Sequence, residues 1–234
     1  MTASPALLKA IQNLGNKYPH VRARAVADIA TALSAHGPKV DEEVRIAVRC
    51  LAEHAADADE QTAVKACGCL VIPGAGAAPA FPELARACLD RRPAVAVGAA
   101  TALVKLVKIN ALTRMKMVGV LPTLVGGLMA MHPDVVSQFA AILRTLDDAA
   151  DSAIEQLAEE YLTREPQGFA EQLLEKMTGR YRKRWQRCFE LLGKVGPAAE
   201  PAVPVLREFL KSADPWLVQQ AKGCLIRIRR TAEE

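Results

Sequence analysis

Residues 192–206 read LGKVGPAAEPAVPVL, and residues 70–84 read LVIPGAGAAPAFPEL. When the two segments are aligned at their first leucine, a glycine, two prolines and the last leucine fall in matching places. Partial copies occur at 120–124 and 33–38. Self-similarity of this kind predicts a chain built from structural repeats. The matching residues are Gly196, Pro201, Pro204 and Leu206 in one copy and Gly74, Pro79, Pro82 and Leu84 in the other.

A second signature alternates with the first. Each copy starts at a proline or a charged residue, and apolar residues follow two, six and ten positions later, as in Pro93, Val95, Ala99 and Leu103. This spacing places the apolar residues on one face of a helix, and proline is well tolerated in a first helical turn. The pattern therefore predicts the second helix of a two-helix repeat. Copies start at Pro19, Pro93, Pro133 and Pro215, with weaker ones near Glu60 and Arg182.

The steps between copies are roughly 33 to 41 residues, with a longer one before Arg182, as a two-helix repeat requires. We expect an all-α fold, a right-handed α-solenoid of about six helix pairs in one domain, residues 1–234. The fifth pair should be irregular, because Pro166, Gly168 and Gly179 can split it into three helices. The expected pairs are 3–36, 41–74, 77–109, 111–147, 149–194 and 198–230.

Glycine and proline also predict where helices begin and end. A glycine after a second helix, as at Gly74 and Gly196, should cap that helix with a positive φ. Proline near the start of a first helix should delay or bend it. Pro82, Pro122 and Pro204 occupy that position.

The composition excludes several classes of protein. Hydrophobic residues make up 51% of the chain, charged residues 24% and aromatic residues only 4%, which excludes a disordered, collagen-like or disulfide-rich chain. The longest uncharged runs, 66–82 and 117–133, are too short and too broken by Pro and Gly to span a membrane. The six cysteines lie in apolar stretches typical of reduced thiols, and the N-terminus lacks a signal-peptide pattern. We therefore expect a cytoplasmic protein without a membrane partner.

The repeat pattern resembles HEAT repeats, in particular the short bacterial and phycobilisome-lyase-like kind. The resemblance covers nearly the whole chain and is best over 191–228, where the Gly-Pro-Ala-Ala turn, Pro204 and Asp214-Pro215 fall in order. It implies an armadillo-like α-solenoid with a concave surface formed by the second helices. It implies no single function, because such repeats serve many roles.

The sequence does not contain the residue patterns of a catalytic or metal site. The four histidines are not spaced at i, i+3 or i+4, and no Cys-x-x-Cys occurs, so we expect no metal. The Gly74–Pro79 segment resembles the start of a dinucleotide loop, but it aligns with the Gly196 turn and is interpreted as a corner between helices. We therefore predict that the chain is not an enzyme and has no cofactor.

Residues 176–194 form a basic block in which Tyr181, Trp185 and Phe189 alternate with cations. On a helix, its aromatic and apolar residues share one stripe and its cations the neighbouring stripe. Two plain alternatives are that the cations only solvate the helix, or that they pair with the acidic run 147–165. The functional interpretation is an anion- or partner-binding face. Its candidate residues are Arg180, Lys183, Arg184 and Arg187, with Trp216 and Lys222 on the last helix.

Two hypotheses follow for function. The first is a non-enzymatic scaffold or adaptor that binds a protein or peptide partner on the concave face. The alternative is a nucleic-acid-binding HEAT protein, since the bacterial alkylpurine DNA glycosylases are similar in length and also present a basic concave surface. No glycosylase motif matches residue by residue, so no catalytic residue is assigned. The sequence leaves the oligomeric state open.

Overall fold

The structure, a computed structural model, describes residues 5–36, 40–162 and 179–230, apart from the side chains of Arg180 and Arg230. The described residues form helices and turns, without strands, and the predicted all-α solenoid class is confirmed. Two compact units can be distinguished, Met1–Gln138 and Phe139–Glu234. The division falls inside one helix, α9 (Pro133–Leu146). The single domain predicted from the sequence stays a prediction.

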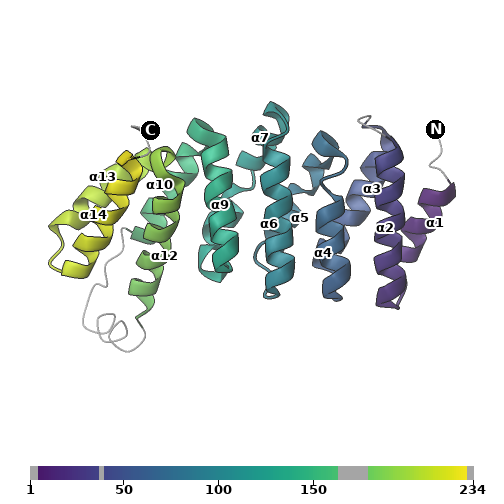
Figure 1. The fold of residues 1–234 in the computed structure, drawn as a ribbon, viewed down its shortest axis with the longest axis horizontal. Coiled ribbons are helices and arrows are strands. Elements are labelled where there is room, and N and C mark those ends of the chain that lie inside the picture. The colour runs from purple at the N-terminus through teal and green to yellow at the C-terminus, as the bar shows by residue number, and fades with distance from the viewer. Residues whose placement is uncertain (1–4, 37–39, 163–178, 231–234) are drawn as a thin grey trace. The chain divides into compact units, whose positions relative to one another are not determined.

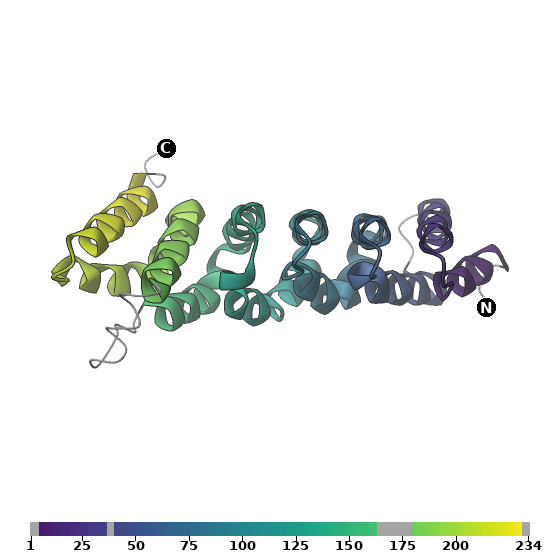
Figure 2. The same cartoon turned by 90° about the horizontal axis from the view of Figure 1, so that it is seen from below.

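The first unit consists of helix pairs arranged in two layers (Figures 1 and 2). One layer contains the second helices of the pairs, α2, α4 and α6, which Figure 2 shows nearly end-on in one row. The other layer contains the first helices, which include short 3-10 segments. The elements are α1 (Pro5–Leu14), α2 (Pro19–His36), α3 (Glu42–Glu53), η1 (His54–Ala56), α4 (Glu60–Cys69), η2 (Gly74–Ala80), α5 (Phe81–Ala87), α6 (Pro93–Val107), α7 (Ala111–Val118), α8 (Leu121–Gly126) and η3 (Leu128–Ala130).

The second unit repeats this arrangement. In Figure 2, α12 and α14 lie in one layer, and α10 and α13 lie in the other. Gly179, one of the residues expected to interrupt the fifth pair, has a φ of 57° and immediately precedes α12. Pro166 and Gly168 lie outside the described residues. The elements are η4 (Asp147–Ala150), α10 (Asp151–Leu162), α12 (Arg180–Val195), η5 (Gly196–Ala202), α13 (Val203–Glu208), η6 (Phe209–Lys211) and α14 (Pro215–Arg230).

Proline marks the helix starts as predicted, and Gly196 caps α12, but α4 ends at Cys69 with Leu70 as its cap, so Gly74 begins η2 and does not cap that helix. Gly74 and Gly196 have positive φ values of 57° and 70°, which a residue with a Cβ adopts only at a cost. The helices α5, α8 and α13 each begin one residue before a proline, because proline needs no hydrogen-bond acceptor for its nitrogen in a first turn. The proline therefore delays the start of the helix rather than bending it.

The apolar stripes of the second helices form the core. In α6, Val95, Ala99 and Leu103 are fully buried, as their spacing predicted. In α14, Leu217 and Ala221 are buried as well. Alanine is frequent at these positions, and its small side chain lets neighbouring helices approach closely. No described helix is both long enough and apolar enough to cross a lipid bilayer.

A set of polar contacts joins the turns that precede the second helices of the first unit. Arg22 at the start of α2 donates to both carboxylate oxygens of Asp57, at 2.7 and 2.8 Å. Arg92 before α6 forms an ion pair with Asp90 and donates to the backbone carbonyl of Asp57 at 2.7 Å. These bonds satisfy buried groups between helices and fix the stacking of neighbouring repeats.

Candidate functional site

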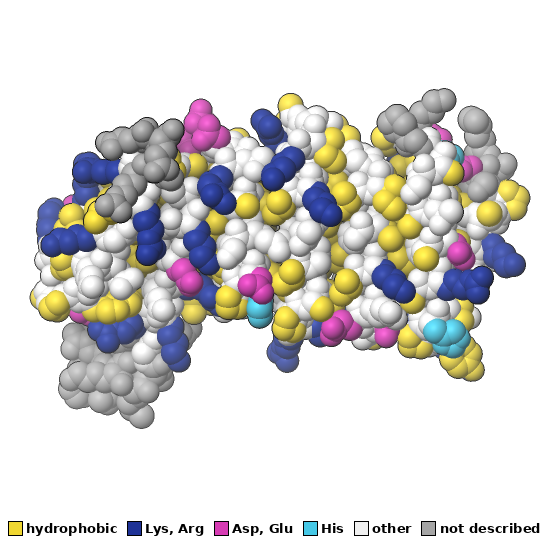
Figure 3. Space-filling model, viewed as in Figure 1, with side chains coloured by type: hydrophobic (Ala, Val, Ile, Leu, Met, Phe, Trp, Pro, Cys, Tyr) yellow, Lys and Arg dark blue, Asp and Glu magenta, His cyan; other side chains and the backbone are white. Residues whose placement is uncertain are grey.

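The basic block lies on α12 and, with the cations of α14, forms one face of the second unit, which we call the α12–α14 basic face. The two helices carry ten basic residues and one acidic residue, Glu190. Figure 3 shows their Lys and Arg side chains gathered over α12 and α14. In contrast, α10 in the other layer carries four acidic residues and no basic one. The two second helices are therefore basic, whereas α10 is acidic.

Two contacts set the register of the helices, which pack against each other. The Arg182 guanidinium carbon lies 4.8 Å from the centre of the Trp216 ring. Arg227 crosses to α12 over Gly193, where a Cβ would lie 3.0 Å from its Nη1 atom. Each contact joins residues 34 positions apart, so α12 and α14 run parallel.

The predicted apolar stripe of α12 is buried. Trp185, Cys188 and Leu192 are at most 6% exposed, and Tyr181 is half-buried. The Trp185 ring packs against the edge of Phe209 with the ring centres 6.1 Å apart. These contacts hold α12 in one orientation, in which Arg182 and Lys183 are exposed.

Lys183 and Lys222 are the candidates best placed to bind an anion. Both side chains are exposed, and no described carboxylate forms an ion pair with either. Arg187 is half-buried and lies 3.9 Å from Glu190, which also contacts Lys194 at 3.8 Å.

The side chains of Arg184 and Trp216 contact other residues of the protein and are less accessible to a partner. The Arg184 guanidinium lies 4.8 Å from the centre of the Tyr161 ring and donates to the backbone carbonyl of Glu160, near the end of α10. A cation at a helix C-terminus is favourable because the last carbonyls carry partial negative charge. The half-buried Trp216 is covered by Arg182, which also pairs with Asp214 at 3.3 Å. Arg180 belongs to α12, but its side chain lies outside the described residues.

Part of this face was not predicted from the sequence. The exposed Arg229 lies two helical turns after Lys222, and Ile226, which is 51% exposed, lies between them. Arg182 and Asp214 were also not selected as a pair.

Comparison with known proteins supports the fold assignment. No family model and no curated protein sequence matches the chain. Among solved structures, the karyopherin Kap121p bound to the extreme C-terminus of the protein phosphatase Cdc14p is similar, with a TM-score of 0.61 and 14% identity over 97% of this chain and 26% of that chain. Kap121p bound to the SUMO protease Ulp1p is similar to the same degree, with a TM-score of 0.61, 15% identity, and 97% and 25% coverage.

A designed armadillo repeat protein in complex with the peptide (KR)4 is also similar, with a TM-score of 0.50, 15% identity, 97% coverage of this chain and 100% of that chain. This chain spans about a quarter of the karyopherin. The fold is that of an α-solenoid of the HEAT and armadillo type.

Proposed function

We propose that this protein is a non-enzymatic scaffold that binds an acidic segment of a partner protein on the α12–α14 basic face. The observation that carries the proposal is the group of exposed cations, Lys183, Lys222 and Arg229, on two parallel, packed helices whose sequences contain one acidic residue. Complementary charge raises the rate of encounter and selects acidic partners over basic ones. The exposed Ile226 between Lys222 and Arg229 adds an apolar contact to the charged ones.

Proteins of the same fold support this use. The similar karyopherin structures show Kap121p bound to other proteins, and the similar designed armadillo repeat protein is in complex with the basic peptide (KR)4. The face described above has the opposite charge preference, so its partner segment should be rich in Asp and Glu. We also propose that the protein is cytoplasmic and bacterial, and its free cysteines support a reducing compartment.

The test is fluorescence anisotropy of the full chain with labelled (DE)4 and (KR)4 peptides. We expect (DE)4 to bind and (KR)4 not to bind. Reversing two exposed cations of the face, Lys183→Glu with Lys222→Glu, should weaken binding of (DE)4 by about tenfold or more. The matched control is Arg207→Glu with Lys211→Glu, which makes the same change in net charge on exposed positions of α13 and η6. Equal weakening by the control, or no binding of (DE)4, would refute the proposal.

Nucleic acid is the second candidate for the same face, favoured by the same excess of cations. Binding of labelled duplex DNA and of single-stranded RNA is measured over a series of salt concentrations. Binding tighter than that of (DE)4, with log K falling linearly with log salt and a shallower slope in the Lys183→Glu, Lys222→Glu variant, would replace the peptide proposal. A damaged-base excision assay would then follow.

A further inference from the structure

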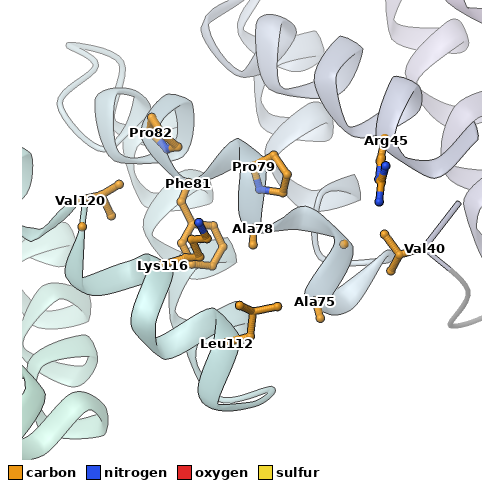
Figure 4. Close-up of a pocket in the computed structure, with 12 residues that line it drawn as sticks. Val40, Arg45, Ala75, Ala78, Pro79, Phe81, Pro82, Leu112, Lys116 and Val120 are labelled. Atoms are coloured by element: carbon orange, nitrogen blue, oxygen red, sulfur yellow. The ribbon is translucent and has the colours of Figure 1, made fainter. Parts of the chain in front are cut away.

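The first unit contains a groove that the proposed function does not use. It has a volume of about 560 Å³ and runs from the start of α3 across η2 to α7. Figure 4 shows Val40 and Arg45 on one side, Leu112 and Lys116 on the other, and Ala78 between them. The volume falls within the range of about 300 to 1,000 Å³ that is usual for ligand sites.

The groove is open because its floor is made of small residues. The η2 segment reads GAGAAPA, so no side chain larger than proline rises from it. A Cβ at Gly76 would lie 3.2 Å from a methyl carbon of Val40, a tight contact that the Val40 side chain would have to relieve by shifting. The buried Phe81 completes the floor, and α3 and α7 stand apart on either side.

The rim of the groove is apolar and exposed. Val40 is 45% exposed and Leu112 is 48% exposed. Ile109, three residues before Leu112, is 43% exposed and lies over Gly74, the first residue of η2. Exposed apolar side chains gathered around a hollow are typical of a surface that binds a partner.

The charges of the groove select the kind of partner. Among the described residues that line the groove, Arg45 and Lys116 are the charged ones, and none of these described residues carries a carboxylate. Arg45 has only a weak, exposed contact with Glu42 at 3.7 Å, and no described carboxylate pairs with Lys116.

We infer that this groove binds a short segment of a partner protein that combines an apolar anchor with acidic residues. The anchor lies over the small-residue floor between Val40 and Leu112, and the carboxylates face Arg45 and Lys116. Such a segment matches both the apolar rim and the positive lining, and a buried anchor with charged flanks is a common way to bind a peptide. The site lies in the first unit and is independent of the α12–α14 basic face.

The test is selection from a phage-displayed library of random dodecapeptides against the full chain, with subtraction against the variant Leu112→Asp, Lys116→Glu. Both substituted residues are exposed, so the variant should fold, which circular dichroism checks. We expect enriched peptides that contain Leu, Ile or Phe beside Asp or Glu. Labelled copies should bind the wild type and lose about tenfold or more in affinity with Lys116→Glu alone.

The matched control is Arg114→Glu, which makes the same charge change on α7 at an exposed residue outside the groove lining. It should leave the affinity nearly unchanged. The inference is overturned if no peptide is enriched on the wild type over the variant, or if the enriched peptides are basic. It is also overturned if the chain dimerises in sedimentation and the groove variant is monomeric, because the occupant would then be a second copy.

Discussion

Asp57 and Arg22 lie 35 positions apart in the sequence, yet they form an ion pair with two hydrogen bonds. The side chains are only 6% and 14% exposed, respectively. Burial alone would raise the pKa of Asp57, but the hydrogen bonds from Arg22 and from the backbone N–H of Asp59, with the charge of Arg22, outweigh it. The pKa of Asp57 is therefore below its ordinary value.

The lowered pKa determines how this pair depends on pH. The folded state binds the proton of Asp57 less readily than the unfolded state does, so the stabilisation is complete above the ordinary Asp pKa of about 3.9. It is lost as the pH falls through the lowered pKa of the folded state. Acid should therefore weaken the contact between α2, which contains Arg22, and the turn before α4, which contains Asp57.

We predict that Asp57→Asn lowers the free energy of unfolding by about 1 to 3 kcal/mol at neutral pH, because Arg22 loses its charged partner. The variant should also lose less stability than the wild type between about pH 5 and pH 2. Urea unfolding followed by circular dichroism at several pH values measures both effects. Asp28→Asn, at an exposed position of α2, is the control and should change little. An unchanged acid dependence in Asp57→Asn would contradict the prediction.

At the scale of elements, the second unit is held together by an aromatic cluster. Phe209 in η6 packs edge-on against Trp185 and Phe189 of α12, with ring centres 6.1 and 5.7 Å apart. Phe209 is 7% exposed, so its removal leaves a cavity beneath α12. The short η6 segment, which follows α13, is thus joined to α12 by these aromatic contacts.

We predict that Phe209→Ala lowers the free energy of unfolding by about 3 to 5 kcal/mol, the usual cost of truncating a buried phenylalanine. Urea unfolding monitored by Trp185 fluorescence, in a Trp216→Phe background, measures the change. Leu210→Ala is the control, since Leu210 is the next residue and is 37% exposed. A cost for Leu210→Ala equal to that for Phe209→Ala would show that the aromatic contacts are not responsible.

Local patterns predicted the elements well because their causes are local. The helix faces follow from residue spacing, and the start of α6 and the end of α12 follow from Pro93 and Gly196. The groove in the first unit did not follow from any pattern. It depends on how far α3 and α7 stand from η2, which is a property of packing and not of one segment.

The partners of individual side chains were the least predictable part. Helical spacing placed Arg184 and Lys183 together on one basic face. Only the structure shows that Arg184 turns to Tyr161 and the end of α10, whereas Lys183 stays exposed. Neighbouring cations on one helix can therefore differ in role, because the contact that decides it comes from another helix.

At the scale of the whole molecule, the cysteines report on folding. Cys67 and Cys88 are buried in the first unit, and Cys188 and Cys224 are buried in the second unit. Burial raises the pKa of each of these thiols, to about 12 for Cys67 and Cys224. The reactive thiolate is therefore scarce in the folded protein at mildly alkaline pH. The remaining two cysteines, Cys50 and Cys69, are half-buried.

We predict that the four buried thiols react with a thiol reagent only when the chain unfolds, and that all four do so at one denaturant midpoint. The reason is that α9 is one continuous helix to which both units contribute, so unfolding of either unit removes part of the other. The measurement is alkylation at increasing urea concentration, with each site read by mass spectrometry. The experiment uses a Cys50→Ser, Cys69→Ser variant, in which the two half-buried thiols are absent and cannot be alkylated in the native state. Two separate midpoints, one for each pair of thiols, would show that residues 1–234 are two domains and not one.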